Sequence, residues 1–225
     1  MRYPILLFDA DNTLFDFDRA QSHALQLALT ELNGYFEPHF LTTYAEVNHG
    51  FWQAFERGEI SQSELKRQRF PAVIKQLGLS IDPVETNALY LKRLSESYFL
   101  LDGACELVER LAASHRLGLI TNGLKDVQRP RFSASPITKH FEAIVISDEL
   151  GIAKPDPGIF EALLELLGNP SKTDLLMIGD SLSSDIQGGI NFGINTCWFN
   201  PNGKDRGSMS PTHEISSLDQ LDNIV

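Results

Sequence analysis

Two aspartates lie two positions apart near the start of the chain, directly after a short apolar run. Asp9 and Asp11 follow Ile5–Phe8, and on an extended backbone residues i and i+2 point to the same side. Two further acidic residues, Asp180 and Asp185, follow a later apolar run. Carboxylates gathered in one place repel each other unless a cation lies among them. This oxygen-rich set therefore predicts a hard divalent cation, with Mg²⁺ as the first choice.

The other polar candidates have the chemistry of phosphate binding. Lys154 offers a compact positive charge, Thr121 offers a hydroxyl, and the backbone amides of Asn122 and Gly123 can donate to phosphate oxygens. Taken singly, each group has a commoner structural role. A Thr-Asn-Gly sequence is usually a turn, an isolated lysine usually lies in solvent, and Asp185 can equally cap the helix that follows it.

A short apolar run lies directly before, or a few residues before, each polar cluster. These runs predict the strands of a β-sheet. Uninterrupted runs of this length are typical of parallel strands covered on both faces. Segments with helical spacing separate them, so we expect an α/β fold with a doubly wound, mostly parallel sheet. In such sheets ligands bind beyond the carboxyl ends of the strands, where the polar clusters would converge. The predicted strands are Ile5–Phe8, Leu117–Ile120, Ala143–Ile146, Leu175–Ile178 and Thr196–Phe199.

Residues 16–100 have no strand-like run and keep the apolar spacing of helices. Turn signals at Asn33-Gly34, Gly58 and Asp82-Pro83 divide this stretch. We therefore expect an α/β core of residues 1–15 and 101–225, interrupted by a helical unit of residues 16–100.

The inserted helices contain candidates for contact with a substrate. Phe51, Trp52 and Phe55 either pack in the core of the bundle, which we favour for any single ring, or include a surface on which a base stacks. The turn Gly58–Ile60 lies between two predicted helices. It is the better candidate for a loop that reaches the site.

Charge and composition narrow the class of protein. The chain has 225 residues, with 19 Lys and Arg against 30 Asp and Glu, for a net charge of −11. Such a chain is a poor general binder of nucleic acid or anionic membrane, and its first apolar run is too short for a signal peptide or a membrane span. Its two cysteines indicate no disulfide framework. We expect a cytoplasmic protein with a small phosphorylated substrate and no nucleic-acid or membrane partner; the oligomeric state stays open.

The order of the four polar clusters resembles that of the haloacid dehalogenase superfamily, the aspartate-nucleophile phosphohydrolases. The inserted helices look like the small mobile cap of that family. The matching motifs are Asp9-x-Asp11-x-Thr13, Thr121, Lys154-Pro155, and Gly179-Asp180 with Asp185 five positions later. A closer likeness, to pyrimidine 5′-nucleotidases, lies in Thr121-Asn122-Gly123, Asp180 to Asp185, Gly188 to Asn191, Thr196-Cys197-Trp198 and Ser216-Ser217-Leu218.

The resemblance implies a Mg²⁺-dependent phosphomonoesterase that acts on nucleoside 5′-monophosphates, with pyrimidine nucleotides preferred. Asp9 would attack phosphorus and form an aspartyl-phosphate. Asp11 would protonate the leaving alkoxide and then activate the water that hydrolyses the intermediate. Asp9, the backbone carbonyl of Asp11 and Asp180 would hold Mg²⁺, with Asp185 orienting that set.

The same resemblance assigns Thr121, Asn122 and Lys154 to the transferred phosphoryl group. The sequence departs from the family pattern at Asn12, where glycine is commoner, and at Pro130, which lies where the helix after the second motif should run.

Three other functions share some of these motifs. A sugar-phosphate phosphatase or mutase has the same core motifs and differs in its cap. A dehalogenase has no evident use for an acidic Asp11. A phospho-accepting signalling domain also gathers aspartates, a threonine and a lysine at a sheet edge, but needs no inserted helical unit of this size.

Overall fold

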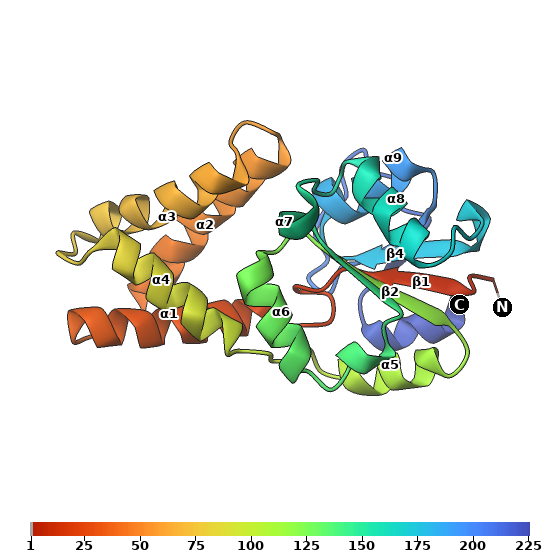
Figure 1. Cartoon of the computed structure of the whole chain (residues 1–225), viewed down its shortest axis with the longest axis horizontal. Coiled ribbons are helices and arrows are strands. Elements are labelled where there is room, and N and C mark those ends of the chain that lie inside the picture. Colours follow the sequence, from red (N-terminus) through yellow and green to blue (C-terminus); the bar gives the residue numbers. More distant parts are fainter. Residues whose placement is uncertain (1) are drawn as a thin grey trace.

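The computed structural model describes residues 2–225, and its centre is a parallel β-sheet (Figure 1). Within these residues the sheet has six strands in the order β3-β2-β1-β4-β5-β6, and every neighbouring pair is parallel. The strand order reverses beside β1, which is where ligands bind in open α/β sheets. The strands are β1 (Ile5–Phe8), β2 (Arg116–Thr121), β3 (Ala143–Ile146), β4 (Leu175–Gly179), β5 (Asn195–Phe199) and β6 (His213–Ile215).

Helices cover both faces of the sheet. All four residues of β1 are buried, because separate apolar clusters pack against its two faces. In Figure 1, α5 lies on one side of the sheet, and α8 and α9 lie on the other. The helices of this α/β part are α5 (Ala104–Ala112), α6 (Lys125–Ala134), α7 (Ser147–Leu150), α8 (Pro157–Leu166) and α9 (Gln187–Phe192), with a π-helical turn, η3, over Leu182–Ile186 and short 3₁₀ turns over Thr138–His140, Lys172–Asp174 and Leu218–Asn223.

The five predicted strands are confirmed to within one residue at either end, and the α/β fold with them. The sixth strand, β6, was not predicted. It has only three residues at the edge of the sheet, and its sequence His-Glu-Ile lacks a continuous apolar run. Pro130 lies inside α6, yet the helix continues to Ala134.

Four helices between β1 and α5 form the helical part, and their apolar core also includes Leu124 and Val127 of the α/β part. Asp16 caps the first helix, Ser61 and Glu64 form a capping box at the third, and Asp82 caps the fourth. The predicted helices and their breaks are thus present, while the domain boundaries at residues 15–16 and 100–101 stay predictions. These helices are α1 (Phe17–Asn33), α2 (His39–Glu56), α3 (Gln62–Leu77) and α4 (Pro83–Ser95).

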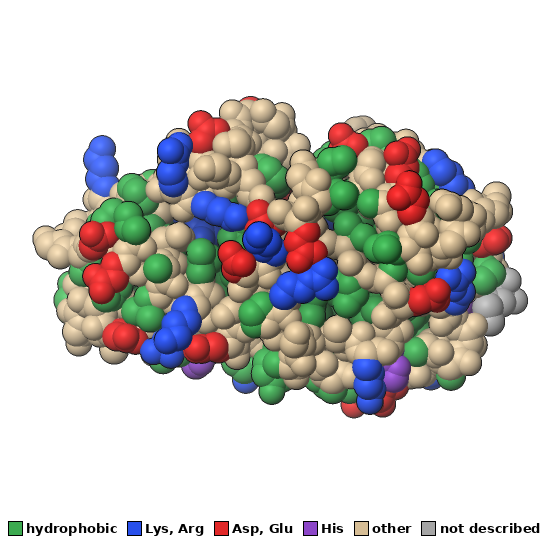
Figure 2. Space-filling model, in the orientation of Figure 1, with side chains coloured by type: hydrophobic (Ala, Val, Ile, Leu, Met, Phe, Trp, Pro, Cys, Tyr) green, Lys and Arg blue, Asp and Glu red, His purple; other side chains and the backbone are tan. Residues whose placement is uncertain are grey.

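The two chain segments that join the parts lie side by side. Phe15 and Leu100 form an isolated antiparallel bridge, and the Asp16 N–H donates to the Phe99 carbonyl over 2.9 Å. Figure 2 shows charged side chains of both signs gathered where the two parts meet. One ion pair joins the two parts, in which Lys66 Nζ of α3 lies 2.9 Å from Asp148 Oδ1 of α7. This arrangement holds the helical part over the carboxyl end of the sheet.

Two further expectations concern the chain as a whole. Within residues 2–225 we find no helix with the length and apolar character needed to cross a membrane. Cys105 and Cys197, whose positions in the sequence indicate no disulfide framework, are both free thiols.

Candidate active site

A cavity of about 590 Å³ lies between the helical part and the carboxyl end of the sheet. Its volume is in the range of pockets for small molecules. Every residue that the sequence marks as a candidate for catalysis, phosphate binding or metal binding lines this one cavity. These residues are Asp9, Asp11, Thr121, Asn122, Lys154, Asp180 and Asp185.

Lys154 joins two of the acidic residues. Its side chain is 1% exposed, and Nζ donates to Asp9 Oδ1 over 2.6 Å, to Asp185 Oδ1 over 2.7 Å and to the Ile120 carbonyl over 2.9 Å. Burial opposes the charge, but the carboxylates of Asp185 and Asp9 outweigh it and raise the pKa of Lys154 above its usual value. Lys154 is therefore a fixed cation at the end of β1.

The carboxylates still outnumber this cation, and the pKa values of Asp9 and Asp180 are raised. Burial raises the pKa of Asp9 well above its usual value, and nearby Asp185 and Asp180 raise it further, against the opposing effect of Lys154. Burial, followed by the charge of Asp185, raises the pKa of Asp180 to about 7. Negative charge at this position is thus held at a cost that a bound cation would relieve.

The donor set fits a magnesium ion. Asp9, Asp180 and Asp185 each offer a carboxylate oxygen, and these three oxygens lie within 4.8 Å of one another. Oxygen-only sets of this kind suit Mg²⁺. The backbone of Asp180 is fixed at both ends: its N–H donates to Thr13 Oγ1, and its carbonyl accepts from the indole of Trp198. Across residues 2–225 the carboxylate of Asp180 accepts no hydrogen bond. The unused carboxylate of Asp180 is available to a cation.

Backbone geometry at the end of β4 brings Asp185 close. Asp185 lies in η3, and its Oδ2 accepts from the Ser181 N–H over 2.9 Å while Oδ1 accepts from Lys154. A Cβ atom at Gly179 would lie 2.2 Å from Asp185 Oδ2. Glycine is therefore required at position 179 for Asp185 to reach Lys154.

Asp11 is held by two side chains that sequence reasoning missed. Arg131 Nη1 donates to Asp11 Oδ1 over 2.7 Å, and Gln128 Nε2 donates to Asp11 Oδ2 over 2.8 Å. Arg131 is fully buried, and its Nε donates to the Ser97 carbonyl. The only available signal was a pair of polar residues three positions apart on the helix after Thr121, on one helix face.

The loop after β2 is tied to Lys154 by the Asn122 side chain. The Asn122 side chain pairs with the backbone of Lys154, with Oδ1 accepting from the N–H over 2.8 Å and Nδ2 donating to the carbonyl over 2.9 Å. The Asn122 side chain thus positions Lys154, and binding of a phosphate by the Asn122 backbone amide stays a prediction. Thr121 Oγ1 accepts from the Gly123 N–H and from Gln128 Nε2, each over 3.0 Å, so its hydroxyl hydrogen is left to donate to a ligand.

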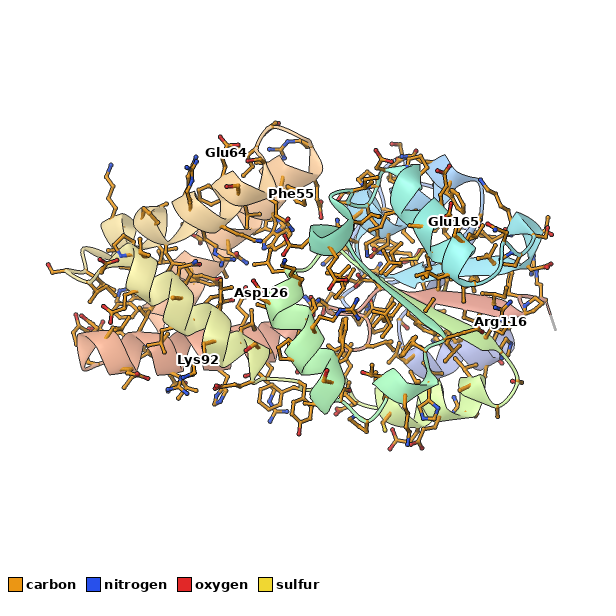
Figure 3. All side chains as sticks on the ribbon, in the orientation of Figure 1. Phe55, Glu64, Lys92, Arg116, Asp126 and Glu165 are labelled. Carbon is orange, nitrogen blue, oxygen red and sulfur yellow. The ribbon has the colours of Figure 1, made fainter. Side chains whose placement is uncertain are left out.

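The helical part contributes one of the three aromatic side chains marked as candidates, and the favoured interpretation, packing in the core of the bundle, was wrong for all three. Trp52 lines the cavity, whereas Phe51 and Phe55 do not, and all three are half-buried outside the bundle core. Phe55 lies at the end of the helical part nearest the α/β part (Figure 3). The turn that begins at Gly58 is present, but Gly58 lines a separate cavity beside Pro155. The prediction that this turn reaches the main cavity was wrong.

Comparisons with known proteins add the family context. The haloacid dehalogenase-like hydrolase family matches residues 3–193. Pyrimidine 5′-nucleotidase YjjG of Escherichia coli is 33% identical over 226 residues, covering 100% of this chain and 99% of that protein. Pyrimidine 5′-nucleotidase PynA of Streptococcus pneumoniae is 34% identical, covering 98% and 94%.

A solved structure resembles the whole chain. The crystal structure of the HAD-hydrolase YfnB from Bacillus subtilis, bound to magnesium, has a TM-score of 0.94 and 35% identity and covers 100% of this chain and 99% of that one. Both the family match and this structural match include the strand ends that form the cavity.

Proposed function

The chain belongs to the haloacid dehalogenase-like hydrolase family, and on that premise we propose that it is a Mg²⁺-dependent phosphomonoesterase that hydrolyses pyrimidine nucleoside 5′-monophosphates. The membership confirms the resemblance carried by the four sequence motifs. The observation that carries the proposal is the juxtaposition of Asp9, Lys154 and Asp180 at the end of the sheet, beside a cavity large enough for a nucleotide.

Asp9 is the proposed nucleophile. One of its carboxylate oxygens forms a bond to phosphorus, and the bond from phosphorus to the ester oxygen breaks. Lys154 lies 2.6 Å from Asp9 Oδ1, so its charge orients the nucleophile and stabilises the equatorial phosphoryl oxygens. The Thr121 hydroxyl donates to one of the same oxygens.

Asp11 is the proposed proton carrier. It gives a proton to the departing alkoxide, and it then takes a proton from the water that attacks the aspartyl-phosphate, which releases phosphate and regenerates Asp9. Arg131 and Gln128 both donate to the Asp11 carboxylate. These two contacts fix the position of the Asp11 carboxyl group in the cavity.

Magnesium would be held by Asp9, Asp180 and the backbone carbonyl of Asp11, with Asp185 beside them. When bound, the ion supplies positive charge that offsets the repulsion between these carboxylates and a phosphate dianion. Asp185 also accepts from Lys154 and from the Ser181 N–H, so it fixes the lysine relative to the ion.

The pyrimidine preference rests on the two nucleotidases of similar sequence and on a cavity wall that includes Trp52, Leu91 and Leu94. Such side chains suit the apolar faces of a base. The cytoplasm is the proposed location, since both cysteines are free thiols.

A phosphate-release panel tests the proposal. It compares UMP, dUMP and dTMP with AMP, hexose phosphates, phosphoglycolate and a haloacid, each with Mg²⁺ and with EDTA. We expect pyrimidine nucleotides to have the highest kcat/KM and EDTA to abolish turnover. A hexose phosphate or phosphoglycolate preferred by about tenfold, or 1.4 kcal/mol of transition-state stabilisation, would overturn the nucleotidase assignment.

A further inference from the structure

Arg69 of α3 is a buried cation that the reaction above does not use. The residue is only 3% exposed, and within residues 2–225 its hydrogen bonds go to the neutral side chains of Asn48 and Asn87 and not to a carboxylate. Its guanidinium instead lies 5.3 Å from the ring centroids of Phe70 and Tyr90. A buried charge without a counter-ion is costly, so its retention beside a cavity calls for a functional reason.

One donor of Arg69 remains unused. Nη1 donates to Asn48 Oδ1 over 3.0 Å, and Nη2 donates to Asn87 Oδ1 over 3.3 Å. The buried Nε has no hydrogen-bond partner in the part of the chain that the structure describes. An unsatisfied buried donor costs free energy, and because this Nε is itself buried, a ligand in the cavity meets Gln21 of the same hydrogen-bond chain rather than Nε.

The guanidinium also fixes the direction of a hydrogen-bond chain. Arginine can only donate, so the Asn48 oxygen must face Arg69 and the Asn48 amide nitrogen must face away from it. That nitrogen donates to Gln21 Oε1 over 2.9 Å. The remaining amide group of Gln21, Nε2–H₂, is consequently left as a donor. Arg69, Asn48 and Gln21 thus form one hydrogen-bonded chain, the Arg69 network.

The Arg69 network lies on the wall of the catalytic cavity. All three residues line it, together with Asp9 and Lys154. They come from α3, α2 and α1, so they belong to the helical part, whereas Asp9 and Lys154 belong to the α/β part. With the phosphoryl group at the sheet edge, the leaving group extends toward the helical part and meets this network.

The network matches a neutral acceptor better than a second anion. Asp18, Glu46 and Glu56 line the same cavity, and their charges disfavour a second phosphate or carboxylate beside them. A carbonyl oxygen satisfies a donor without adding charge. Uracil and thymine carry two ring carbonyl groups, whereas adenine carries none and presents an amino donor instead.

We propose that the Arg69 network binds a ring carbonyl oxygen of the leaving group and thereby selects nucleotides of uracil and thymine over those of adenine. This inference rests on the proposed function and assigns its base specificity to particular residues. Gln21 supplies the donor, and Arg69 holds that donor in its orientation through Asn48.

Gln21→Glu tests the proposal because it replaces the free amide donor with an acceptor of nearly the same shape. The new carboxylate can still accept the hydrogen bond from Asn48. Gln26→Glu is the matched control, since Gln26 is an exposed glutamine on the same helix and does not line the cavity. The readout is the ratio of kcat/KM for UMP to kcat/KM for AMP. A loss of folding or of phosphate chemistry lowers both values and leaves the ratio unchanged.

We expect Gln21→Glu to lower the UMP to AMP ratio by about tenfold or more and Gln26→Glu to leave it within about twofold, because a mispaired polar group at a binding site is rejected strongly. Arg69→Lys, which keeps the charge but removes the planar donor set, should lower the ratio as well. An unchanged ratio in both Gln21→Glu and Arg69→Lys overturns the inference. If the unaltered protein prefers a hexose phosphate to UMP, it is the proposed function that fails.

Discussion

At the scale of single residues, Asp9 and Asp11 differ in what surrounds them. Asp9 contacts Lys154 and lies near Asp180 and Asp185, whereas Asp11 accepts from Arg131 and Gln128. The first environment concentrates charge at an oxygen that can attack phosphorus. The second fixes the Asp11 carboxyl group through Arg131 and Gln128 instead of Lys154, and a proton carrier requires such a fixed position.

Asp11→Asn tests this separation of roles. The variant cannot transfer a proton, so hydrolysis of UMP, which has a poor alkoxide leaving group, should fall by about 10²-fold or more. Hydrolysis of an aryl phosphate with an acidic phenol should fall much less. Steady-state rates on the two substrates measure the difference.

Asp126→Asn serves as the control, because Asp126 is an exposed aspartate on α6 (Figure 3). It should leave both rates within about twofold, as is usual for surface substitutions. Equal losses on both substrates in Asp11→Asn would argue against proton transfer by this residue.

Seven site residues could be predicted from the sequence because motif spacing and strand ends place them at one edge. Arg131 and Gln128 could not, since nothing in the sequence fixes which face of α6 turns toward Asp11. The pairing of the Asn122 side chain with the Lys154 backbone could not be predicted either, because it joins two loops 32 positions apart.

At the scale of elements, the ends of the strands determine the geometry of the site. β1, β2 and β4 are adjacent and parallel, so Asp9, Thr121 and Asp180 follow or end neighbouring strands at one edge. Apolar runs made these strands predictable. The Gly58 turn was predicted as a turn, but its position over Pro155 depends on the packing of the helical part on the α/β part, which local sequence does not encode.

Gly179→Ala tests the importance of the end of β4. The added methyl group would lie 2.2 Å from Asp185 Oδ2 and must displace that carboxylate from Lys154. We expect kcat for UMP to fall by about tenfold or more, because misplaced catalytic groups lose rate steeply, and the half-saturating Mg²⁺ concentration to rise.

Gly50→Ala is the control, since Gly50 lies inside α2 and a Cβ added there would have no neighbouring atom within 4 Å. Alanine there should raise the free energy of unfolding by about 0.5–1 kcal/mol, the usual gain inside a helix, and preserve activity. Normal Mg²⁺ dependence in Gly179→Ala would contradict the proposed arrangement of Asp185.

At the scale of the whole molecule, the cavity is formed only when the helical part lies over the sheet. Lys66 pairs with Asp148, and Ser183 Oγ donates to Glu56 Oε2 over 2.6 Å, so polar contacts join the two parts around the cavity. The sequence predicted both parts but not these contacts, because each joins residues distant along the chain.

The charge concentrated in this cavity predicts a pH dependence of stability. The pKa of Asp180 is about 7 in the folded chain, against 3.8 ordinarily. Between these values the folded chain binds more protons than the unfolded chain, so the metal-free protein should lose stability as pH rises from about 4 to 7. Mg²⁺ competes with the proton, and its stabilising effect should grow over the same range.

Thermal unfolding in EDTA and in Mg²⁺ between pH 5 and 8 measures both effects. Asp180→Asn removes the titrating group, so its Tm in EDTA should exceed that of the unaltered protein by more at pH 8 than at pH 5, and Mg²⁺ should raise its Tm less. A difference between the two proteins that is constant with pH would contradict the raised pKa of Asp180.

The central claim is that Asp9 forms the bond to phosphorus, and the most direct test is hydrolysis of UMP in Mg²⁺ by the unaltered protein and by Asp9→Asn, measured side by side. We expect rapid phosphate release from the unaltered protein and a loss on the order of 10⁴-fold or more in Asp9→Asn, as is typical when a nucleophile is removed. Both proteins should unfold at similar temperatures. Phosphate release by Asp9→Asn within about tenfold of the unaltered rate would contradict the account.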